Sequence, residues 1–484
     1  MSPTPAPAEA TPLALTARKG FAWQGAAFVL ARLTLLASTV VLARVLGPSD
    51  YGLISFGLTI VTALNVVSDF GASQAIVYLP RTPRRIDTAL AQGILGSLLL
   101  VVLWVVSVPF LLEWLDEPGD VLMLQVLSLV LVFTSIGQVP DAVLRKSLQF
   151  QKRLPGEMAR GLTRGVVAIT LALSGFGAWS LVWAEILGSI AYAVVCWIMV
   201  DHRPGPIRRW VDPNEMRTIL DFGFPAAVNG GLATVVLNVD YFVVISTLGA
   251  ASLGYYFVGF RIPELVILSV FQIFSQVTYP LYAHVNGETG RLRRGYLLSM
   301  RIQATYGFGA GIAIAVASPV IVPVLFGEKY AATVPVMSAI AIYAVFRSLS
   351  TGAVDVFKAV GRPKLGMWLG VGRLVLLVPA LFLATRWGIT GVAVAQAVMA
   401  LLFTLATQQV VCRVIDLSWG KLLKSLTPSA LVGVGSGLGA WIGMLVVPGE
   451  SWWSLIAAGA GTVLVGGAAL LLLDRGTVRK VLRG

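Results

Sequence analysis

The sequence predicts an all-α polytopic membrane protein with about fourteen transmembrane helices. Of its 484 residues, 57% are hydrophobic and 12% are charged, and the mean hydropathy is +0.84. A water-soluble fold cannot bury that much apolar surface. Apolar stretches of span length recur along the chain, with Lys and Arg gathered in alternate loops. Fourteen spans of about 20 residues use roughly 280 positions, which leaves no room for an extramembrane domain.

The apolar stretches form two sets of six and a final pair. The first set lies near residues 21–44, 52–78, 87–111, 121–143, 157–175 and 178–200. The second set lies near 218–247, 253–282, 296–325, 332–357, 365–386 and 389–412, and the pair near 423–446 and 452–473. The predicted organisation is a disordered tail (1–17), an N-lobe (18–203), a cytoplasmic linker helix (204–217), a C-lobe (218–414), spans 13 and 14 (415–476) and a C-terminal tail (477–484).

The basic residues test this count of spans. If every span has been found, Lys and Arg collect in every second loop, and they do so from Arg18 and Lys19 through to the C-terminal tail. An even number of spans with both termini in the cytoplasm follows. The net charge of +13 is therefore explained by membrane topology, and we expect no nucleic-acid partner. In the linker, Asp212 is expected to cap a helix that begins at Pro213.

An internal repeat relates the two sets of six. With a shift of 202 residues, Leu46 and Gly47 fall on Leu248 and Gly249, and Gly52 falls on Gly254. Two homologous six-helix lobes in parallel orientation are predicted, with a substrate site in a cavity between them.

The chain also resembles a known family over most of its length. The similar stretches are ARVLGPSDYGLISFGLTIVTALNVVSDFGASQAIVYLPR, LNVDYFVVISTLGAASLGYYFVGFRIPEL and LQFQKRLPGEMARGLTRGVVAITLALSGFGAWSLV. They resemble the polysaccharide transporter family of the multidrug/oligosaccharidyl-lipid/polysaccharide exporter superfamily. The resemblance implies a Wzx-type flippase in a bacterial plasma membrane, with two six-helix lobes around a cationic cavity. Such a protein carries undecaprenyl-pyrophosphate-linked oligosaccharide outward by alternating access.

Charged residues within the spans are the candidate functional residues, because a charge at mid-bilayer costs about 2.5–3.5 kcal/mol on insertion scales. The candidate substrate-binding residues are Arg32, Arg261, Arg347 and Arg373. Their guanidinium groups match phosphate oxygens and stay charged at any pH. The candidate gating or coupling residues are Asp69, Asp240, Glu185 and Glu264. The alternative is that these charges neutralise one another and hold helices together, as Arg261 and Glu264 could across one turn.

Polar side chains extend these sites along three spans. At 100° per residue, Gln272, Ser275 and Glu264 each fall within about 60° of Arg261. Asn65 shares a face with Asp69, and Asn229 shares one with Asp240. These stripes are expected to line the cavity, since positions facing lipid carry no such groups.

The same residues exclude some functions and leave others open. We expect no cofactor, no metal and no catalysis, because the sequence lacks a phosphate-binding loop and clustered metal ligands. An ion-coupled small-molecule antiporter of the same superfamily is one alternative, and a membrane-embedded sugar polymerase or ligase is another. The expected partners are membrane lipid, the lipid-linked oligosaccharide, and H+ or Na+ as the coupling ion. We expect a monomer, with polysaccharide polymerase machinery as an open further partner. The final polymer, whether O-antigen, capsule, exopolysaccharide or teichuronic-type, stays open.

Overall fold

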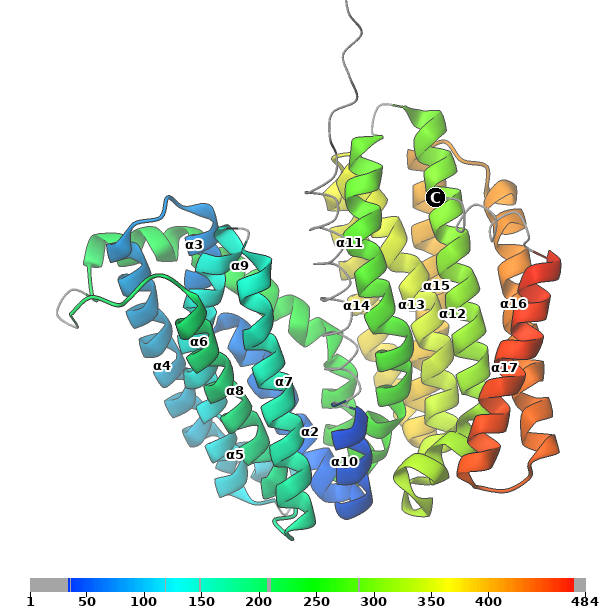
Figure 1. Ribbon diagram of the computed structural model, residues 1–484, viewed down its shortest axis with the longest axis horizontal. Helices are drawn as coiled ribbons and strands as arrows, with labels where there is room; N and C mark the ends of the chain where they lie inside the picture. The colour runs from blue at the N-terminus through cyan, green and yellow to red at the C-terminus, as the bar shows by residue number, and fades with distance from the viewer. Residues whose placement is uncertain are drawn as a thin grey trace, which may run out of the picture. The chain divides into compact units, whose positions relative to one another are not determined.

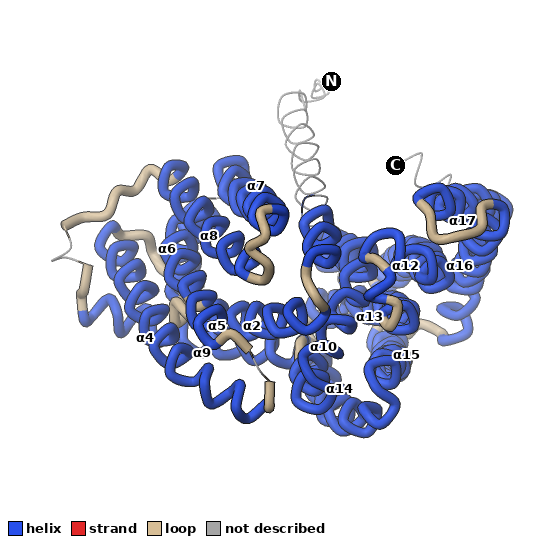
Figure 2. Tube along the Cα trace, turned by 90° about the horizontal axis from the view of Figure 1, so that it is seen from below, coloured by secondary structure: helices blue, strands red, loops and turns tan. Residues whose placement is uncertain are grey.

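The protein is helical wherever its structure is described. The computed structural model describes residues 34, 36–117, 119–147, 149–206, 210–285 and 288–473, and the regular structure in these ranges is entirely helical (Figures 1 and 2). Within them, ten segments are long and apolar enough to cross a membrane. The predicted all-α polytopic class is confirmed.

The chain divides into two compact units. Unit 1 comprises Gly57–Leu237 with the described residues up to Val45, and unit 2 comprises Leu46–Phe56 with the chain from Asn238 onward. The helix α2 (Pro48–Val67) therefore contributes its first part to unit 2 and its second part to unit 1.

Unit 1 is built from helices that pack side by side. They are the second part of α2, then α3 (Ala72–Tyr78), α4 (Pro83–Leu115), α5 (Val121–Leu127), α6 (Leu129–Lys146), α7 (Phe150–Leu173), α8 (Trp179–Met199) and α9 (Pro213–Leu237). Helix α8 packs against both α7 and α6, and α6 packs against α4 (Figure 1). A buried apolar cluster from α3, α4 and α6, which includes Ile76, Ile86 and Val143, fills the space between them.

Local signals fix where these helices begin and end. The hydroxyl of Thr82 accepts the Arg85 N–H at 3.2 Å, and Pro83 occupies the first helical position of α4. Helix α4 ends where Asp116 adopts a left-handed conformation with φ 52°. The carboxylate of Asp120 then accepts the Met123 N–H at 3.1 Å and starts α5.

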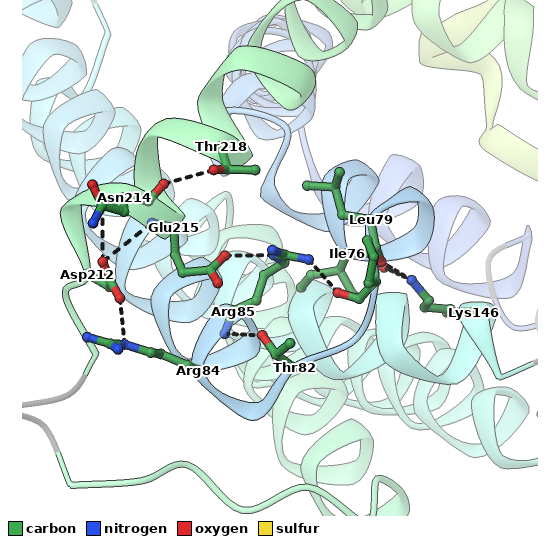
Figure 3. A network of polar contacts seen from close by, with 11 residues as sticks. Ile76, Leu79, Thr82, Arg84, Arg85, Lys146, Asp212, Asn214, Glu215 and Thr218 are labelled. Atoms are coloured by element: carbon green, nitrogen blue, oxygen red, sulfur yellow. Dashed lines mark hydrogen bonds and ion pairs between the residues drawn. The ribbon is translucent and has the colours of Figure 1, made fainter.

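Ion pairs join the start of α9 and the residue before it to the start of α4. Asp212 accepts the Asn214 N–H at 3.0 Å, so the predicted N-cap is confirmed. The same carboxylate pairs with Arg84 at 2.5 Å, and Glu215 pairs with Arg85 at 2.7 Å (Figure 3). The helix that this cap starts is 25 residues long and continues to Leu237, so the expected short linker helix is the beginning of α9.

A second contact holds the connection between α8 and α9. The ring of His202 lies 2.8 Å from one Asp87 oxygen, and the Gly205 N–H donates to the other at 3.1 Å. Asp87 is buried near the start of α4. The connection is therefore held at both of its ends by the same helix.

Unit 2 holds the remaining helices. They are α10 (Val239–Pro263), the π-helical turn Glu264–Leu268, α11 (Ser269–His284), α12 (Thr289–Phe326), α13 (Thr333–Ala359), α14 (Pro363–Ala384), α15 (Gly388–Val414), α16 (Trp419–Val446) and α17 (Trp452–Leu473), with single 3-10 turns at Glu328–Tyr330 and Thr385–Trp387. Helix α12 packs against α13 and α16, and α16 packs against α17 (Figure 1). Buried side chains such as Tyr296, Phe357 and Val411 form a core between α12, α13 and α15.

Two glycines in unit 2 allow a reciprocal close approach of two helical turns. A Cβ added to Gly52 would lie 1.9 Å from the Ala250 carbonyl oxygen, and one added to Gly254 would lie 1.9 Å from the Pro48 carbonyl oxygen. The predicted repeat pairs Gly52 with Gly254, and the same shift pairs Pro48 with Ala250. Each turn therefore meets its repeat counterpart through the same atoms. Gly249, with φ 83° and ψ 173°, breaks α10 just before this contact.

Candidate functional site

Two arginines on neighbouring helices of unit 2 converge on one tyrosine ring. The Cζ atom of Arg347 lies 5.9 Å from the centroid of the Tyr343 ring, and that of Arg373 lies 6.0 Å from it. Tyr343 and Arg347 are four residues apart on α13, so they share a face of that helix. Arg373 comes from α14. Both guanidinium groups lie at the distance of a cation–π contact.

The tyrosine ring is held in place by packing. Tyr343 is 4% exposed, and Phe260 of α10 contacts it edge to face with a centroid separation of 5.6 Å. Tyr241 packs against Phe260 in the same way at 5.8 Å. The platform on which the two arginines lie is therefore part of the buried aromatic core of unit 2.

The two charges at this platform have no acidic counterpart in the described part of the chain. Within the described residues, neither Arg347 nor Arg373 forms an ion pair, and the Nε atom of Arg373 is buried without a hydrogen-bond partner. Buried donors in proteins are normally satisfied, and a guanidinium group presents a planar fork that fits carboxylate and phosphate oxygens. The arrangement is suited to an anion that brings at least two acceptor oxygens.

The third predicted arginine has a different environment. Arg261 pairs with Glu264 at 3.3 Å across one helical turn and lies over the Phe257 ring at 5.5 Å. The ion pair that the sequence allowed as an alternative is therefore formed. Arg261 is largely buried and Glu264 is 44% exposed at its side chain, so the carboxylate is the partner that can be displaced without uncovering the core.

Asp240 is a buried carboxylate that accepts a hydrogen bond from a tyrosine hydroxyl. Its side chain lies in α10, and the hydroxyl of Tyr256 donates to its Oδ2 at 3.0 Å. Among the described residues, its Oδ1 has no hydrogen-bond partner, and neither does the buried Oε1 of Gln396 on α15. A carboxylate in this position can be neutralised by a proton or by a small cation, because an uncompensated buried charge is costly.

The carboxylate of Asp69 accepts hydrogen bonds from backbone N–H groups. Its two carboxylate oxygens accept the N–H groups of Gly71 and Ser73, both at 2.9 Å, at the start of α3. Asn65, one turn earlier on α2, accepts a hydrogen bond from the Gln138 side chain of α6 at 2.7 Å. In the structure, this polar stripe of unit 1 orders the end of α2 and joins α2 to α6.

Glu185 of α8 lies in an interhelical ion pair. It contacts Arg164 of α7 at 2.6 Å, and the Glu185 side chain is 6% exposed. The sequence analysis assigned Glu185 to gating or coupling without identifying its partner.

Two predicted site residues cannot be placed. Arg32 lies outside the described residues, and the side chain of Asn229 in α9 is likewise outside them.

The polar stripe expected on α10 and α11 is interrupted by the π-helical turn. A π turn has i→i+5 hydrogen bonds and holds one extra residue, which rotates all later side chains by roughly 100° relative to a continuous α-helix. Ser275 consequently donates to Asp355 of α13 at 2.6 Å, and Gln272 is exposed. Both residues were predicted to lie beside Arg261 because a continuous α-helix has 3.6 residues per turn, and the π turn departs from that geometry.

Several residues of this region were not predicted from the sequence. Tyr343 had a readable signal, since an aromatic residue four positions before Arg347 shares its face. Asp355 is buried and accepts hydrogen bonds from two hydroxyls of α11, and its position inside an apolar stretch was a signal too. The proximity of Gln396 to the Asp240 region had no sequence signal, because it depends on the packing of α15 against α10.

Comparison with known proteins adds a family to this geometry. Residues 41–335 match a family described as polysaccharide biosynthesis protein. The teichuronic acid biosynthesis protein TuaB of Bacillus subtilis (strain 168) is 24% identical over 376 residues, which cover 77% of each chain. The lipopolysaccharide biosynthesis protein WzxC of Escherichia coli (strain K12) is 24% identical over 378 residues, which cover 75% of this chain and 74% of WzxC.

Solved structures share the fold. The lipid II flippase MurJ in an inward closed conformation superposes with a TM-score of 0.71 at 12% identity, covering 95% of this chain and 99% of MurJ. An inward-facing multidrug resistance transporter of the MATE family gives 0.63 at 17% identity, covering 81% of this chain and 96% of the transporter. At these identities the similarity establishes the transporter fold alone.

Proposed function

The chain belongs to the family of polysaccharide biosynthesis proteins, and from that premise we propose that it is a flippase for lipid-linked oligosaccharide. It moves an undecaprenyl-pyrophosphate-linked oligosaccharide from the cytoplasmic to the outer leaflet of the plasma membrane by alternating access. Relatives named for teichuronic acid, lipopolysaccharide and succinoglycan biosynthesis support a polysaccharide precursor as the cargo. The fold shared with a lipid II flippase supports a lipid-linked one.

The observation that carries this proposal is the pair of guanidinium groups on Tyr343, neither of which forms an ion pair within the described ranges. Every flippase substrate of this class carries a pyrophosphate, whose oxygens can accept from both Arg347 and Arg373. A transporter for small organic cations would need a negatively charged site at this position instead. The buried, unpartnered Nε of Arg373 is the donor that a phosphate oxygen would satisfy.

Binding of a short-chain analogue tests the role of the two arginines. The purified protein in detergent is titrated with farnesyl pyrophosphate, and with farnesol to measure the lipid contribution alone. We expect Arg347→Gln and Arg373→Gln each to weaken farnesyl pyrophosphate binding about 10- to 100-fold, because a hydrogen bond to a charged group contributes about 1.5–3 kcal/mol. Farnesol binding should not change.

The matched control is Arg386→Gln, which removes the same charge from an exposed position just after α14. It should bind like the wild type. Wild-type affinity in both Arg347→Gln and Arg373→Gln would remove the pyrophosphate role. An absence of any preference for farnesyl pyrophosphate over farnesol in the wild type would remove the proposed function itself.

We assign ion coupling to Asp240. Its carboxylate has one oxygen without a partner among the described residues and no basic neighbour in an ion pair, so H+ or Na+ binding there is chemically reasonable. Asp69, whose oxygens are both occupied by backbone N–H groups, is less suited to that task. Glu185 and Glu264, which pair with Arg164 and Arg261, fit a gating role in which ion pairs break and form.

The membrane orientation also belongs to the proposal. The alternation of basic loops supports a plasma-membrane protein with both termini in the cytoplasm, two six-span lobes bounded at 18–203 and 218–414, and a further pair of spans at 415–476. Reporter fusions at both termini test this orientation, and a periplasmic signal from either would contradict it. A polysaccharide polymerase remains the proposed neighbour of the exported product.

A further inference from the structure

Helix α7 presents guanidinium groups on one face and apolar side chains on the other. At 100° per residue, Arg153, Arg160 and Arg164 fall within about 40° of one another. The opposite face of the helix carries exposed apolar side chains, which are Leu162, Val166 and Leu173. The apolar face is the one suited to lipid, so the arginine face points away from it. These arginines were not among the substrate residues inferred from the sequence.

The carboxylates near this face are shared unevenly among its arginines. Arg153 pairs with Asp141 of α6 at 2.5 Å and with Glu157 at 3.7 Å, and Arg164 pairs with Glu185 of α8 at 2.6 Å. Arg160, between them, lies over the Tyr192 ring with its Cζ 5.7 Å from the centroid. In the part of the chain that is described, Arg160 has no carboxylate partner. Of the three arginines on this face, it is the one whose guanidinium group contacts an aromatic ring in place of a carboxylate.

Packing fixes the position of this cation. A Cβ added to Gly188 of α8 would lie 3.1 Å from the Arg160 carbonyl oxygen and 3.2 Å from the Arg164 Cβ, so the two helices approach closely at this level. Tyr192, the ring under Arg160, is 4% exposed. The guanidinium group therefore lies on a rigid platform, as Arg347 and Arg373 do in unit 2.

The arginines also lie at increasing depth. With a rise of 1.5 Å per residue from Phe150, Arg153 is about 4.5 Å, Arg160 about 15 Å and Arg164 about 21 Å along the helix. The predicted span begins near residue 157, so Arg160 lies about 4.5 Å and Arg164 about 10.5 Å past its cytoplasmic start. The side chains of Arg153 and Arg164 are 35% and 30% exposed, so they are not sealed in protein. Charged side chains within a span usually face the bundle interior or a water-filled cavity, where a polar ligand can reach them.

We propose that this face of α7 is a second diphosphate-binding site, centred on Arg160 and completed by Arg164. It rests on the proposed function, since the ligand is the same lipid-linked pyrophosphate that the Tyr343 platform binds. Arg160 supplies a free planar fork, and Arg164 exchanges its Glu185 partner for a phosphate oxygen. A purely structural arginine stripe would give each cation a carboxylate, and Arg160 has none among the described residues. Arg153 is the first of the three arginines along α7, at the end of the helix that the alternation of basic loops predicts to be cytoplasmic.

The test separates this site from the first one. The double variant Arg347→Gln/Arg373→Gln, which lacks the Tyr343 platform, is titrated with farnesyl pyrophosphate and with inorganic pyrophosphate, so that lipid-linked and free diphosphate are compared. We expect measurable binding that falls about tenfold when Arg160→Gln is added, and less when Arg160→Lys keeps the charge without the fork. Lys152→Gln, an exposed cation on the same helix, is the control and should leave binding unchanged.

A further variant distinguishes binding from helix packing. Glu185→Gln frees Arg164 and should tighten binding several-fold, whereas a purely structural ion pair would leave affinity unchanged or weaken it. Thermal unfolding of each variant identifies those that fail to fold. If the wild type binds farnesyl pyrophosphate but the double variant does not, or if Arg160→Gln has no effect there, the α7 site is refuted and the proposed function stands. If the wild type binds neither compound, both are refuted.

Discussion

The reciprocal glycine contact of unit 2 predicts a large effect from the addition of one methyl group. In Gly254→Ala, the new Cβ would lie 1.9 Å from the Pro48 carbonyl oxygen, where ordinary contact begins at 3.4 Å. The two turns must therefore separate by about 1.5 Å, because the atom in the way belongs to the backbone and cannot rotate aside. Forcing extra volume into a packed site costs about 3 kcal/mol at the upper end of the usual range.

Part of this cost is offset within the helix. Alanine is about 1 kcal/mol better than glycine in a helix interior, so the net destabilisation is about 2 kcal/mol. The assay is the thermal unfolding midpoint of the detergent-solubilised protein. Gly370→Ala is the matched control, since nothing lies within 4 Å of its added Cβ on α14, and it should unfold at the same or a slightly higher temperature.

The repeat adds a second requirement. Gly52→Ala meets the Ala250 carbonyl oxygen at the same 1.9 Å and should destabilise to the same extent. Once one methyl group has separated the turns, the second meets more space, so the double variant should cost less than the two single variants together. A Gly254→Ala variant with the same unfolding temperature as Gly370→Ala would refute the close approach and the reasoning built on it.

Three further substitutions test buried polar contacts. Asp69→Ala leaves two backbone N–H groups without an acceptor and should lower the free energy of unfolding by about 1–3 kcal/mol, measured by thermal unfolding beside the milder Asp69→Asn. A double-mutant cycle on Arg85 and Glu215 should give a coupling of about 1 kcal/mol, because the pair is only partly shielded from water, and a coupling near zero would contradict a stabilising role. Asp240→Asn cannot take up a proton or balance a cation, so reconstituted transport should lose its response to an imposed proton or sodium gradient; an unchanged response would exclude Asp240 from coupling.

The architecture could be predicted because its signals are local or repeated. Span lengths, caps such as Asp212 and the 202-residue shift between Gly52 and Gly254 are all properties of the sequence itself. The two glycines that the repeat matches in sequence also lie in contact in the structure, which the match by itself did not predict. The paired glycines contact each other's turns reciprocally, which is the contact pattern of a two-fold interface.

The candidate site was less accessible to sequence reasoning. The charges of Arg347 and Arg373 could be found from their cost in a membrane, but their convergence on Tyr343 depends on how α13 packs against α14. The π turn after Arg261 changed the direction of Gln272 and Ser275, and no residue pattern indicated it. The capping role of Asp69 could not be predicted from the sequence. A carboxylate inside an apolar stretch looks the same in the sequence whether it binds an ion or accepts the N–H groups at the start of a helix.

The charged face of α7 has a consequence for how the protein is made. Helix α7 is 24 residues long, yet it is not among the ten described segments that are long and apolar enough to cross a membrane. Arg160 and Arg164 each cost about 2.5–3.5 kcal/mol at the centre of a bilayer, and the strongly apolar α8 follows after a short turn through Gly175 and Gly177. Because Glu185 of α8 neutralises Arg164, inserting α7 together with α8 costs less free energy than inserting α7 alone.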